Sequence, residues 1–421
     1  MHWPRRPISP ILRRMPGERV QTLIVGGGQA GLTMSHRLKQ RDLAHLVLER
    51  HRIAERWRSE RWDGLRFQFP NWSVRLPDFP FPHADPDGFA ASSDIVDYIS
   101  AYAAFVAPPI RCGVAVTALR RTTGGFIAQT SGGPIEADNV VVATGPYQRP
   151  ILPAALSDGI GGFQVHASRY SNPDRLPPGA VLVVGSGASG AQITDELVRA
   201  GRRVYLSVGR HTRLPRRYRG RDLIWWLREM GIDQTPVEQR GPSRLLPVIS
   251  GAHGGQTIDF RRFAADGVSL LGRIIAARDG VLDIAPDLAQ SLAGGDAAYA
   301  GFVERADAHV EHHALPMPQD PAALAKPPDP ASVTAPCRRL DIGAEGIAAV
   351  IWATGYGLDF GWIDIPVLNP RGDPVHRHGF TEVPGLYFLG LQWLSKMSSS
   401  FLSGVGDDAA VLADHIAARG D

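Results

Sequence analysis

Two glycine-rich runs have the residue types and the order of dinucleotide-binding turns. The first spans residues 26–31 (GGGQAG) and follows the apolar run 23–25; the second spans residues 185–190 (GSGASG) and follows the apolar run 181–184. In a Rossmann site, such a turn lets the backbone approach a pyrophosphate, which the N-terminal amides of the next helix then receive. One copy alone could be an ordinary strand-to-helix corner. Because the pattern occurs twice, we expect two bound dinucleotides.

The residues that follow the second strand of each unit distinguish the two sites. Glu49 ends the apolar run 44–48, and an acid at this position can accept hydrogen bonds from ribose hydroxyls. The corresponding run 204–208 reaches Arg210 instead, and a guanidinium suits a 2′-phosphate by charge and by its paired donors. Three more basic residues stand behind it: Arg213, Arg216 and Arg217. The pattern predicts FAD at the first site and NADPH at the second.

Composition excludes several classes of protein. The chain has 421 residues, of which 44% are hydrophobic and 21% are charged, so we expect a globular protein of at least two domains. The net charge of +3 comes without a basic, aromatic stripe, so nucleic-acid binding is not supported. No apolar run approaches the ~20 residues of a membrane span, and we expect a cytoplasmic protein. Cys112 and Cys337 are isolated, which argues against a paired-cysteine disulfide reductase and a zinc site.

The order of elements predicts an α/β protein in which one nucleotide domain is inserted into another. Residues 93–106 have helical spacing, residues 127–129 and 135–142 form a hairpin, and residues 347–351 and 386–390 are later strands. Proline-rich and glycine-rich connectors separate the two units. We expect a disordered leader at 1–18, an FAD-binding domain at 19–155 and 337–421, and an NADPH-binding domain at 156–336. Each domain is expected to be Rossmann-like.

With these motifs the sequence resembles the class B flavin-dependent monooxygenases, nearest to the CzcO-like flavoproteins and the YUCCA-type enzymes. The resemblance covers nearly the whole chain. Besides the glycine runs it rests on residues 143–145 (ATG), 353–356 (ATGY) and 404–409 (GVGDDA). Residues 160–170 match the family fingerprint at Gly162, His166 and Tyr170, whereas Ile160 replaces the usual Phe, and Tyr170-Ser171 replaces the Trp-Pro typical of Baeyer–Villiger enzymes.

The resemblance implies roles for individual residues. The candidates for the catalytic site are Gln68, where related enzymes place an Asn facing the flavin, His166 and Tyr170. His166 is interpreted as a residue that couples the two domains without acid or base duty, and Gln68 could equally be a surface residue. No metal ligand is expected. The expected FAD contacts are Gly26, Gly28, Gln29, Ala30, Gly31, Glu49, Arg50, Trp57, Ala143, Thr144, Gly145 and Asp407. The expected NADPH contacts are Gly185, Gly187, Ala188, Ser189, Gly190 and Arg210.

As the resemblance implies, NADPH would reduce FAD, dioxygen would form a C4a-hydroperoxyflavin, and one oxygen atom would pass to a small lipophilic amine, sulfide or 2-oxo acid. Residues 398–401 with Trp393 could line the substrate pocket or form a polar loop. Two other functions stay open: an NADPH oxidase or flavin reductase that releases hydrogen peroxide, and a non-enzymatic redox-sensing flavoprotein. The sequence leaves the substrate unidentified and a homodimer open.

Overall fold

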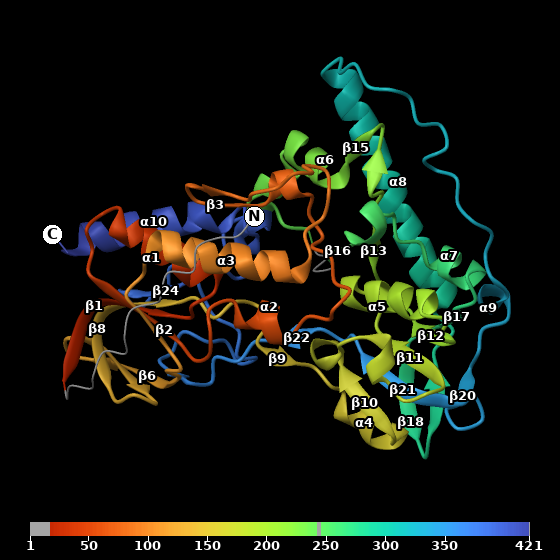
Figure 1. Ribbon diagram of the computed structural model, residues 1–421, viewed down its shortest axis with the longest axis horizontal. Coiled ribbons are helices and arrows are strands. Elements are labelled where there is room, and N and C mark those ends of the chain that lie inside the picture. Colours follow the sequence, from red (N-terminus) through yellow and green to blue (C-terminus); the bar gives the residue numbers. More distant parts are fainter. Residues whose placement is uncertain (1–16, 242–245, 421) are drawn as a thin grey trace.

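The computed structural model describes residues 17–241 and 246–420, so the expected leader lies almost entirely outside the described residues. The chain forms two α/β domains that lie side by side (Figure 1), and each is built around a separate sheet. The first domain carries the beginning and the end of the chain, and the second is made from its middle. This is the predicted arrangement of two Rossmann-like units, one inserted into the other.

The sheet of the first domain is centred on β1 (Glu18–Val25). This strand pairs in parallel with β2 (His45–Glu49) and with β8 (Ile135–Val142). The remaining strands are β5 (Ile110–Cys112), β6 (Val116–Thr122), β7 (Gly125–Thr130), β23 (Ile363–Asp364) and β24 (Leu386–Phe388). The helices α1 (Gln29–Lys39), α3 (Ser92–Val106) and α10 (Val405–Gly420) lie on one side of this sheet (Figure 1).

The return of the chain to this sheet explains how one domain can interrupt another. The last three residues of β8 pair with β24, which comes after the whole second domain. All three residues of β24 are buried, and α10 packs on α1 with Leu412, Ala413 and Ile416 fully buried. The first domain therefore has one core built from both ends of the chain, and it is incomplete without residues beyond 360.

The sheet of the second domain is entirely parallel, with the order β10 (Phe163–His166), β21 (Ile347–Trp352), β11 (Ala180–Val184), β12 (Val204–Ser207) and β17 (Ser269–Leu271). Every residue of β11 is buried, as expected for a parallel strand covered on both faces. One face carries α5 (Ala188–Arg199) and α7 (Phe260–Ala265). The other is covered by α4 (Ala154–Ile160) with the antiparallel strands β18 (Ile274–Arg278), β19 (Val281–Ile284) and β20 (Arg339–Asp341).

One predicted boundary needs correction. The sequence pattern predicts that the first domain resumes at residue 337. In the structure, however, β20 pairs with β19, and β21 lies between β10 and β11 in the second sheet. Strand periodicity marks residues 347–351 as buried without saying which sheet receives them. We therefore propose that the second domain extends to about Gly355, while its start near residue 156 stays a prediction.

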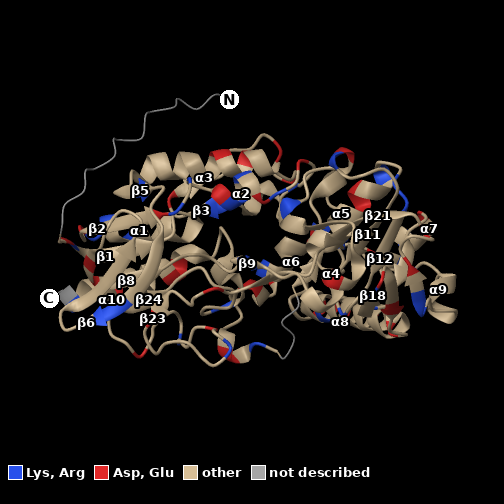
Figure 2. Cartoon of the chain, turned by 90° about the horizontal axis from the view of Figure 1, so that it is seen from below, with Lys and Arg blue, Asp and Glu red and all other residues tan. Residues whose placement is uncertain are grey.

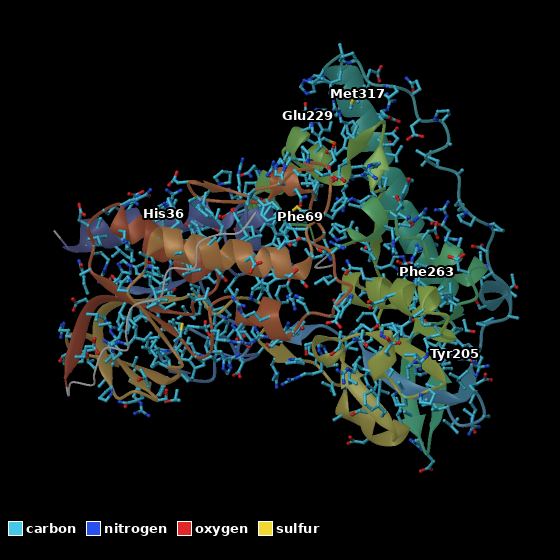
Figure 3. The ribbon with its side chains drawn as sticks, in the orientation of Figure 1. His36, Phe69, Tyr205, Glu229, Phe263 and Met317 are labelled. Atoms are coloured by element: carbon cyan, nitrogen blue, oxygen red, sulfur yellow. The ribbon has the colours of Figure 1, made fainter. Side chains whose placement is uncertain are left out.

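A helical extension of the second domain leans over the junction between the domains. It contains the helices α6 (Leu223–Glu229) and α8 (Leu288–His312), of which α8 is the longer. The short strands of this region are β13 (Thr212–Arg213), β14 (Arg217–Tyr218), β15 (Arg221–Asp222) and β16 (Pro247–Val248), and the short helix α9 (Ala331–Thr334) comes after α8 in the chain. Its hydrophobic cluster receives Phe69 and Trp72 from the first domain. Figure 3 shows Phe69 at the junction, and Glu229 and Met317 further out on the extension.

The two connections between the domains pair with each other. β9 (Arg149–Pro150), on the way out, is antiparallel to β22 (Tyr356–Gly357), on the way back. The shorter elements α2 (Glu55–Ser59), β3 (Arg75–Leu76) and β4 (Phe79–Pro80) belong to the first domain. Acidic and basic segments alternate over both domains (Figure 2). None of the helices that the structure describes has the length and apolar character needed to cross a membrane.

Candidate cofactor and substrate site

The first glycine turn has the close contacts that a pyrophosphate site requires. Gly26 has φ = +116°, and a Cβ on Gly31 would overlap the carbonyl oxygen of Gly26, so neither position accepts a side chain without rearrangement. A Cβ on Gly28 would meet no atom within 4 Å, so the turn is open on that side. Gly28 begins α1 without a side-chain cap, and the first turn of α1 has no acid. The free amides of Gln29 and Ala30 can therefore receive an anion.

The second turn repeats this geometry almost atom for atom. Gly185 has φ = +109°, a Cβ on Gly190 would overlap the carbonyl oxygen of Gly185, and the side of Gly187 is open. Gly187 begins α5 without a side-chain cap, and the first turn of α5, which contains Ala188 and Ser189, has no acid. Both turns thus fit the phosphates of a dinucleotide.

Each turn is backed by one of the two Ala-Thr-Gly segments. A Cβ on Gly26 would lie 2.5 Å from the carbonyl oxygen of Ala143, and one on Gly185 would lie 2.5 Å from that of Ala353. From Thr144 and Gly145 the chain runs to Gln148, whose side chain donates to the Thr144 hydroxyl (2.9 Å) and to the Gly145 carbonyl (2.8 Å). Both segments lead into the paired connectors β9 and β22. The two nucleotide turns are therefore joined by a short path through the domain junction.

The ends of β2 and β12 differ as the sequence predicts. Glu49 Oε2 accepts a hydrogen bond from the Gly27 amide (2.8 Å), and Oε1 accepts one from the His51 amide (2.9 Å), so the carboxylate is held beside the first turn. Arg50, the next residue, is exposed. At the second turn, the Ser186 hydroxyl bonds with the Gly209 amide (3.0 Å), and Arg210 is exposed without an ion pair to any described residue. That guanidinium is available to a phosphate.

Two of the three arginines behind Arg210 are not available to a nucleotide. Arg213 is buried and ion-paired with Asp259 (2.7 Å) and Asp296 (3.0 Å). Arg216 is 1% exposed and pairs with Asp222. Arg217 donates to the carbonyls of Gly254 and Gly255 (3.0 and 3.2 Å). The expectation of a basic cluster is therefore wrong for Arg213 and Arg216, because acids already pair with them. Arg217 is exposed and bonded only through its Nη1, so its part in the cluster stays a prediction.

Gln68 lies in a row of aromatic side chains at the junction. Ring centroids are separated by 5.6 Å from Trp57 to Phe67, by 5.5 Å from Phe67 to Phe69, and by 4.9 Å from Phe69 to Phe401. The Gln68 side chain is half-buried, and its amide has no hydrogen-bond partner in the part of the chain that the structure describes. A side-chain amide without such a partner can bind a cofactor or a substrate.

His166 holds the connection between the domains. It is buried; its Nδ1 accepts a hydrogen bond from the Ser168 amide (3.1 Å), so its Nε2 donates to the Gly355 carbonyl (3.0 Å). Burial lowers the pKa of this imidazole. A neutral ring with both nitrogens engaged fits the interpretation of a coupling residue without acid or base duty.

Tyr170 also has a structural environment. Its hydroxyl donates to Glu196 Oε2 (2.9 Å) on α5, and its ring packs against Trp62 of the first domain. Burial raises the pKa of Tyr170 far above its usual range, and it also raises the pKa of Glu196. The segment around Tyr170 docks on the first domain through the Asp63 amide, which donates to the Ser171 carbonyl (2.9 Å). Tyr170 therefore packs between the domains, and a catalytic role for it stays a prediction.

The start of α10 contains a buried carboxyl that sequence reasoning missed. Asp407, the predicted contact, is exposed and paired with Lys396. Asp408 is 5% exposed and receives a hydrogen bond from Ser395, and burial raises its pKa. Ser398 and Ser399 are buried in a short helical turn, and the Gln29 side chain donates to the Ser400 carbonyl (2.8 Å). The serine run is thus an ordered segment beside the first glycine turn rather than a loose loop. The only sequence feature that could have indicated the buried carboxyl of Asp408 is the adjacent Asp-Asp pair.

Two other observations bear on the chemistry. Cys112 is exposed on β5 of the first domain and Cys337 is half-buried in the second, so the two thiols are far apart in the fold and cannot form a redox pair. Within residues 17–241 and 246–420, no group of three or more His, Cys, Asp and Glu side chains is arranged to hold a metal ion. Fit to the expected nucleotides is therefore the main chemical feature of the site.

Comparison with known proteins agrees with this geometry. Residues 23–227, which contain both glycine turns, match the model of the family described as pyridine nucleotide-disulphide oxidoreductase. The chain is 34% identical over 403 residues to an uncharacterized CzcO-like oxidoreductase of Geobacillus kaustophilus, covering 94% of this chain and 98% of that protein.

Two further relatives extend the similarity. The probable indole-3-pyruvate monooxygenase YUCCA1 of Arabidopsis thaliana is 33% identical over 183 residues, covering 42% of this chain and 44% of that protein. The solved structure of a flavin-containing monooxygenase from Stenotrophomonas maltophilia superposes with a TM-score of 0.66 at 18% identity, covering 96% of this chain and 100% of that chain. That structure shares the fold.

Proposed function

The chain belongs to the family of CzcO-like oxidoreductases within the class B flavin-dependent monooxygenases, and we propose on that premise that it inserts one oxygen atom into a small lipophilic substrate. The cofactors are FAD and NADPH. The overall reaction consumes the substrate, dioxygen, NADPH and a proton, and it yields the oxygenated substrate, water and NADP⁺. When bound, the flavin accepts a hydride from NADPH and activates dioxygen.

The convergence of the two nucleotide turns is the observation that carries this proposal. Hydride transfer requires the nicotinamide to reach the flavin, so the two cofactors must meet at the domain junction. The Ala-Thr-Gly segments behind Gly26 and Gly185 both lead into the β9–β22 pair, which supports a meeting point there. His166 fixes the second of these segments through the Gly355 carbonyl. A protein with a single nucleotide-binding domain would not need this hydrogen-bonded connection between two turns.

The chain's own residues would bind the cofactors, orient them and exclude water. Glu49, held beside the first turn, would accept hydrogen bonds from the ribose of FAD, and the exposed Arg210 would pair with the 2′-phosphate of NADPH. The amides at the start of α10 would stabilise negative charge on the reduced flavin. Gln68 would offer its free amide to the nicotinamide or to the reacting oxygen. The aromatic row beside it would keep water away from that oxygen.

The same row supports a lipophilic substrate. Phe67, Phe69 and Phe401 offer ring faces and edges, whereas Ser398 and Ser399 of the neighbouring serine turn are buried, and the Ser399 hydroxyl accepts a hydrogen bond from the Ser395 amide. Such a wall binds apolar surface and gives few anchors for a strongly hydrated molecule. A sulfide, an amine or a 2-oxo acid with an apolar body fits this description, and the named activity of the YUCCA1 relative falls in the last class.

The test is a two-step rapid-mixing experiment with the purified holoprotein. NADPH is first added without oxygen, and the loss of oxidised-flavin absorbance is followed. Oxygen is then added with and without excess NADP⁺. We expect rapid bleaching, followed by a transient spectrum that differs from both oxidised and reduced flavin and that lives longer with NADP⁺.

Each alternative function predicts a different result. Immediate return to oxidised flavin, with hydrogen peroxide equal to NADPH consumed for every added sulfide, amine and 2-oxo acid, would identify an oxidase and overturn the proposal. Bleaching that takes many minutes would instead identify a non-enzymatic flavoprotein. Substrate-dependent disappearance of the transient would name the substrate class directly.

A further inference from the structure

A buried arginine of the second domain is hydrogen-bonded to the backbone of Gln68 in the first domain. Arg216 Nη1 donates to the Gln68 carbonyl oxygen at 2.7 Å. The other edge of the same guanidinium forms a two-pronged pair with Asp222, with Nε donating to Oδ2 (2.9 Å) and Nη2 to Oδ1 (3.1 Å). The side chain is 1% exposed, so all of these bonds form away from water. Such charge-assisted bonds are directional and fix a carbonyl in orientation as well as in position.

The partners of Arg216 are fixed in turn. Asp222 caps α6 by accepting a hydrogen bond from the Ile224 amide (2.8 Å), and the Arg216 amide donates to the Thr257 hydroxyl (2.8 Å). The guanidinium lies 4.5 Å from the ring centroid of Phe89, a first-domain residue. The Arg216 side chain is therefore held in one position, because each of its polar groups and the face of its guanidinium has a partner.

Two glycines complete the grip on the same segment. A Cβ on Gly251 would overlap the Phe67 carbonyl oxygen, and one on Gly255 would lie 2.7 Å from the Phe89 ring. The backbone of the second domain thus lies directly against Phe67 and Phe89. Only glycine allows so close an approach. The segment that carries Gln68 is therefore held from the second domain as well as by its own, in which the Phe67 amide donates to the Ala90 carbonyl (2.7 Å).

The same loop also carries the group expected to bind NADPH. Arg210 and Arg216 flank β13, where Arg213 is pinned by Asp259 and Asp296. The loop expected to bind NADPH through Arg210 therefore also carries the residue that contacts Gln68.

We propose that Arg216 is a positioning residue that holds the Gln68 side-chain amide toward the flavin from across the domain junction, so that the NADPH-binding loop itself sets the geometry of the reacting centre. This inference rests on the proposed function, because it assigns work to Gln68 at the flavin. It adds a residue that touches neither cofactor nor substrate.

The first measurement is a double-mutant cycle on the rate of anaerobic flavin reduction by NADPH. Arg216→Lys keeps the charge beside Asp222 but cannot bond Asp222 and Gln68 at the same time. We expect about a tenfold slower reduction in Arg216→Lys and in Gln68→Ala, with little further loss when the two are combined. The Kd for NADP⁺, measured from the perturbed flavin spectrum, should change by less than about twofold.

The second measurement reads the contact itself in the protein without NADPH. Hydrogen exchange of the peptide covering residues 65–72 should become faster in Arg216→Lys. The matched control is Arg219→Lys, since Arg219 is a buried arginine of the same hairpin that pairs with Asp307 within its own domain. Exchange of residues 65–72 in that control should equal the wild type. If Arg216→Lys does not fold, the double variant Arg216→Met with Asp222→Asn removes the buried pair together and replaces it in both measurements.

The outcomes separate the inference from the function. Additive losses in the cycle, or unchanged exchange at residues 65–72, would overturn the positioning role while leaving an active, NADPH-reducible flavoprotein. A wild-type protein that NADPH does not reduce would overturn the proposed function instead. Loss of NADP⁺ affinity in Arg216→Lys would place its effect at the nucleotide site and likewise contradict the inference.

Discussion

The two glycine turns share their backbone and differ at one neighbouring position. Both begin with a glycine near φ = +110°, both have overlapping first and last glycines, and both leave the middle glycine open. At the first turn, however, Glu49 bonds the Gly27 amide; at the second, a serine hydroxyl bonds Gly209, and the charged group is the exposed Arg210. We therefore propose that the turn provides a general phosphate site and that the end of the next strand decides which dinucleotide is preferred.

The largest effect should come from filling the turns one at a time. Gly31→Ala and Gly190→Ala each place a Cβ against a carbonyl oxygen, so each should weaken binding at its own site by about a hundredfold or more. Gly31→Ala should be purified without colour. Gly190→Ala should be yellow but not reduced by NADPH. Flavin absorbance and anaerobic reduction measure the two effects.

The matched control for these variants is Gly294→Ala on α8, where an added Cβ meets nothing within 4 Å. It should keep both the flavin and its reduction. Loss of flavin from Gly190→Ala would break the comparison, because it would show that the two turns do not act as separate sites.

Arg210→Gln tests what the second turn recognises. Removing one charge-assisted bond to a phosphate costs about 1.5–3 kcal/mol, so the Kd for NADPH should rise by roughly tenfold to a hundredfold. The Kd for NADH, which lacks the phosphate, should stay the same. Titration of the flavin spectrum with each nucleotide measures both constants. Arg278→Gln, an exposed arginine on β18, is the control; equal losses for NADPH and NADH in Arg210→Gln would contradict the assignment.

Glu49→Gln sharpens the comparison at the first turn. The amide oxygen can accept from only one of the Gly27 and His51 amides, so one hydrogen bond and the charge assistance are lost, and the Kd for FAD should rise by about fivefold. Binding of NADP⁺ should not change. Reconstitution of flavin-free protein with FAD, followed by fluorescence quenching, gives the constant. Glu136→Gln on the same sheet is the control. An unchanged FAD affinity in Glu49→Gln would show that Glu49 only holds the Gly27 amide in place and does not bind the ribose.

The smallest effect concerns pH, and it should be similar in the two domains. Burial lowers the pKa of His45 and His376 in the first domain and of His166 and His211 in the second. Below about pH 6.5 the unfolded chain therefore binds more protons than the folded one, so the free energy of unfolding falls as the pH falls. Thermal unfolding at pH 7.5 and 5.5 should show a lower Tm at pH 5.5. His166→Asn should make this difference smaller, whereas an unchanged difference would contradict the lowered pKa.

The sequence predicts what is encoded locally. The turns at 26–31 and 185–190, the acid Glu49 and the arginine Arg210 are all found within about twenty residues of one another in each unit, and their arrangement follows from strand, turn and helix geometry. The structure has both turns as expected. The α/β architecture with an inserted domain is confirmed for the same reason.

What the sequence did not predict depends on contacts between distant segments. Arg213 was expected to be free because its partners, Asp259 and Asp296, lie far along the chain. The boundary at residue 337 was wrong because a strand pattern does not identify the neighbouring strand. Asp408 was overlooked in favour of Asp407, since only the rotation of α10 determines which of two adjacent acids faces inward. Arg216 was singled out only as a basic residue behind Arg210, because its contact with Gln68 depends on a carbonyl of another domain.

Because β9 pairs with β22, the second domain could be exchanged as a unit for that of a related protein. Its entry and exit strands are hydrogen-bonded neighbours, so the module could be cut out at Pro150 and Tyr356 and replaced by the equivalent piece of a relative without moving either end. Chimaeras joined there would inherit coenzyme preference and the residue at position 216 from the donor, and the rest of the flavin pocket from the host. Recombination at this joint offers an evolving lineage a way to change its electron source while its oxidised product stays the same.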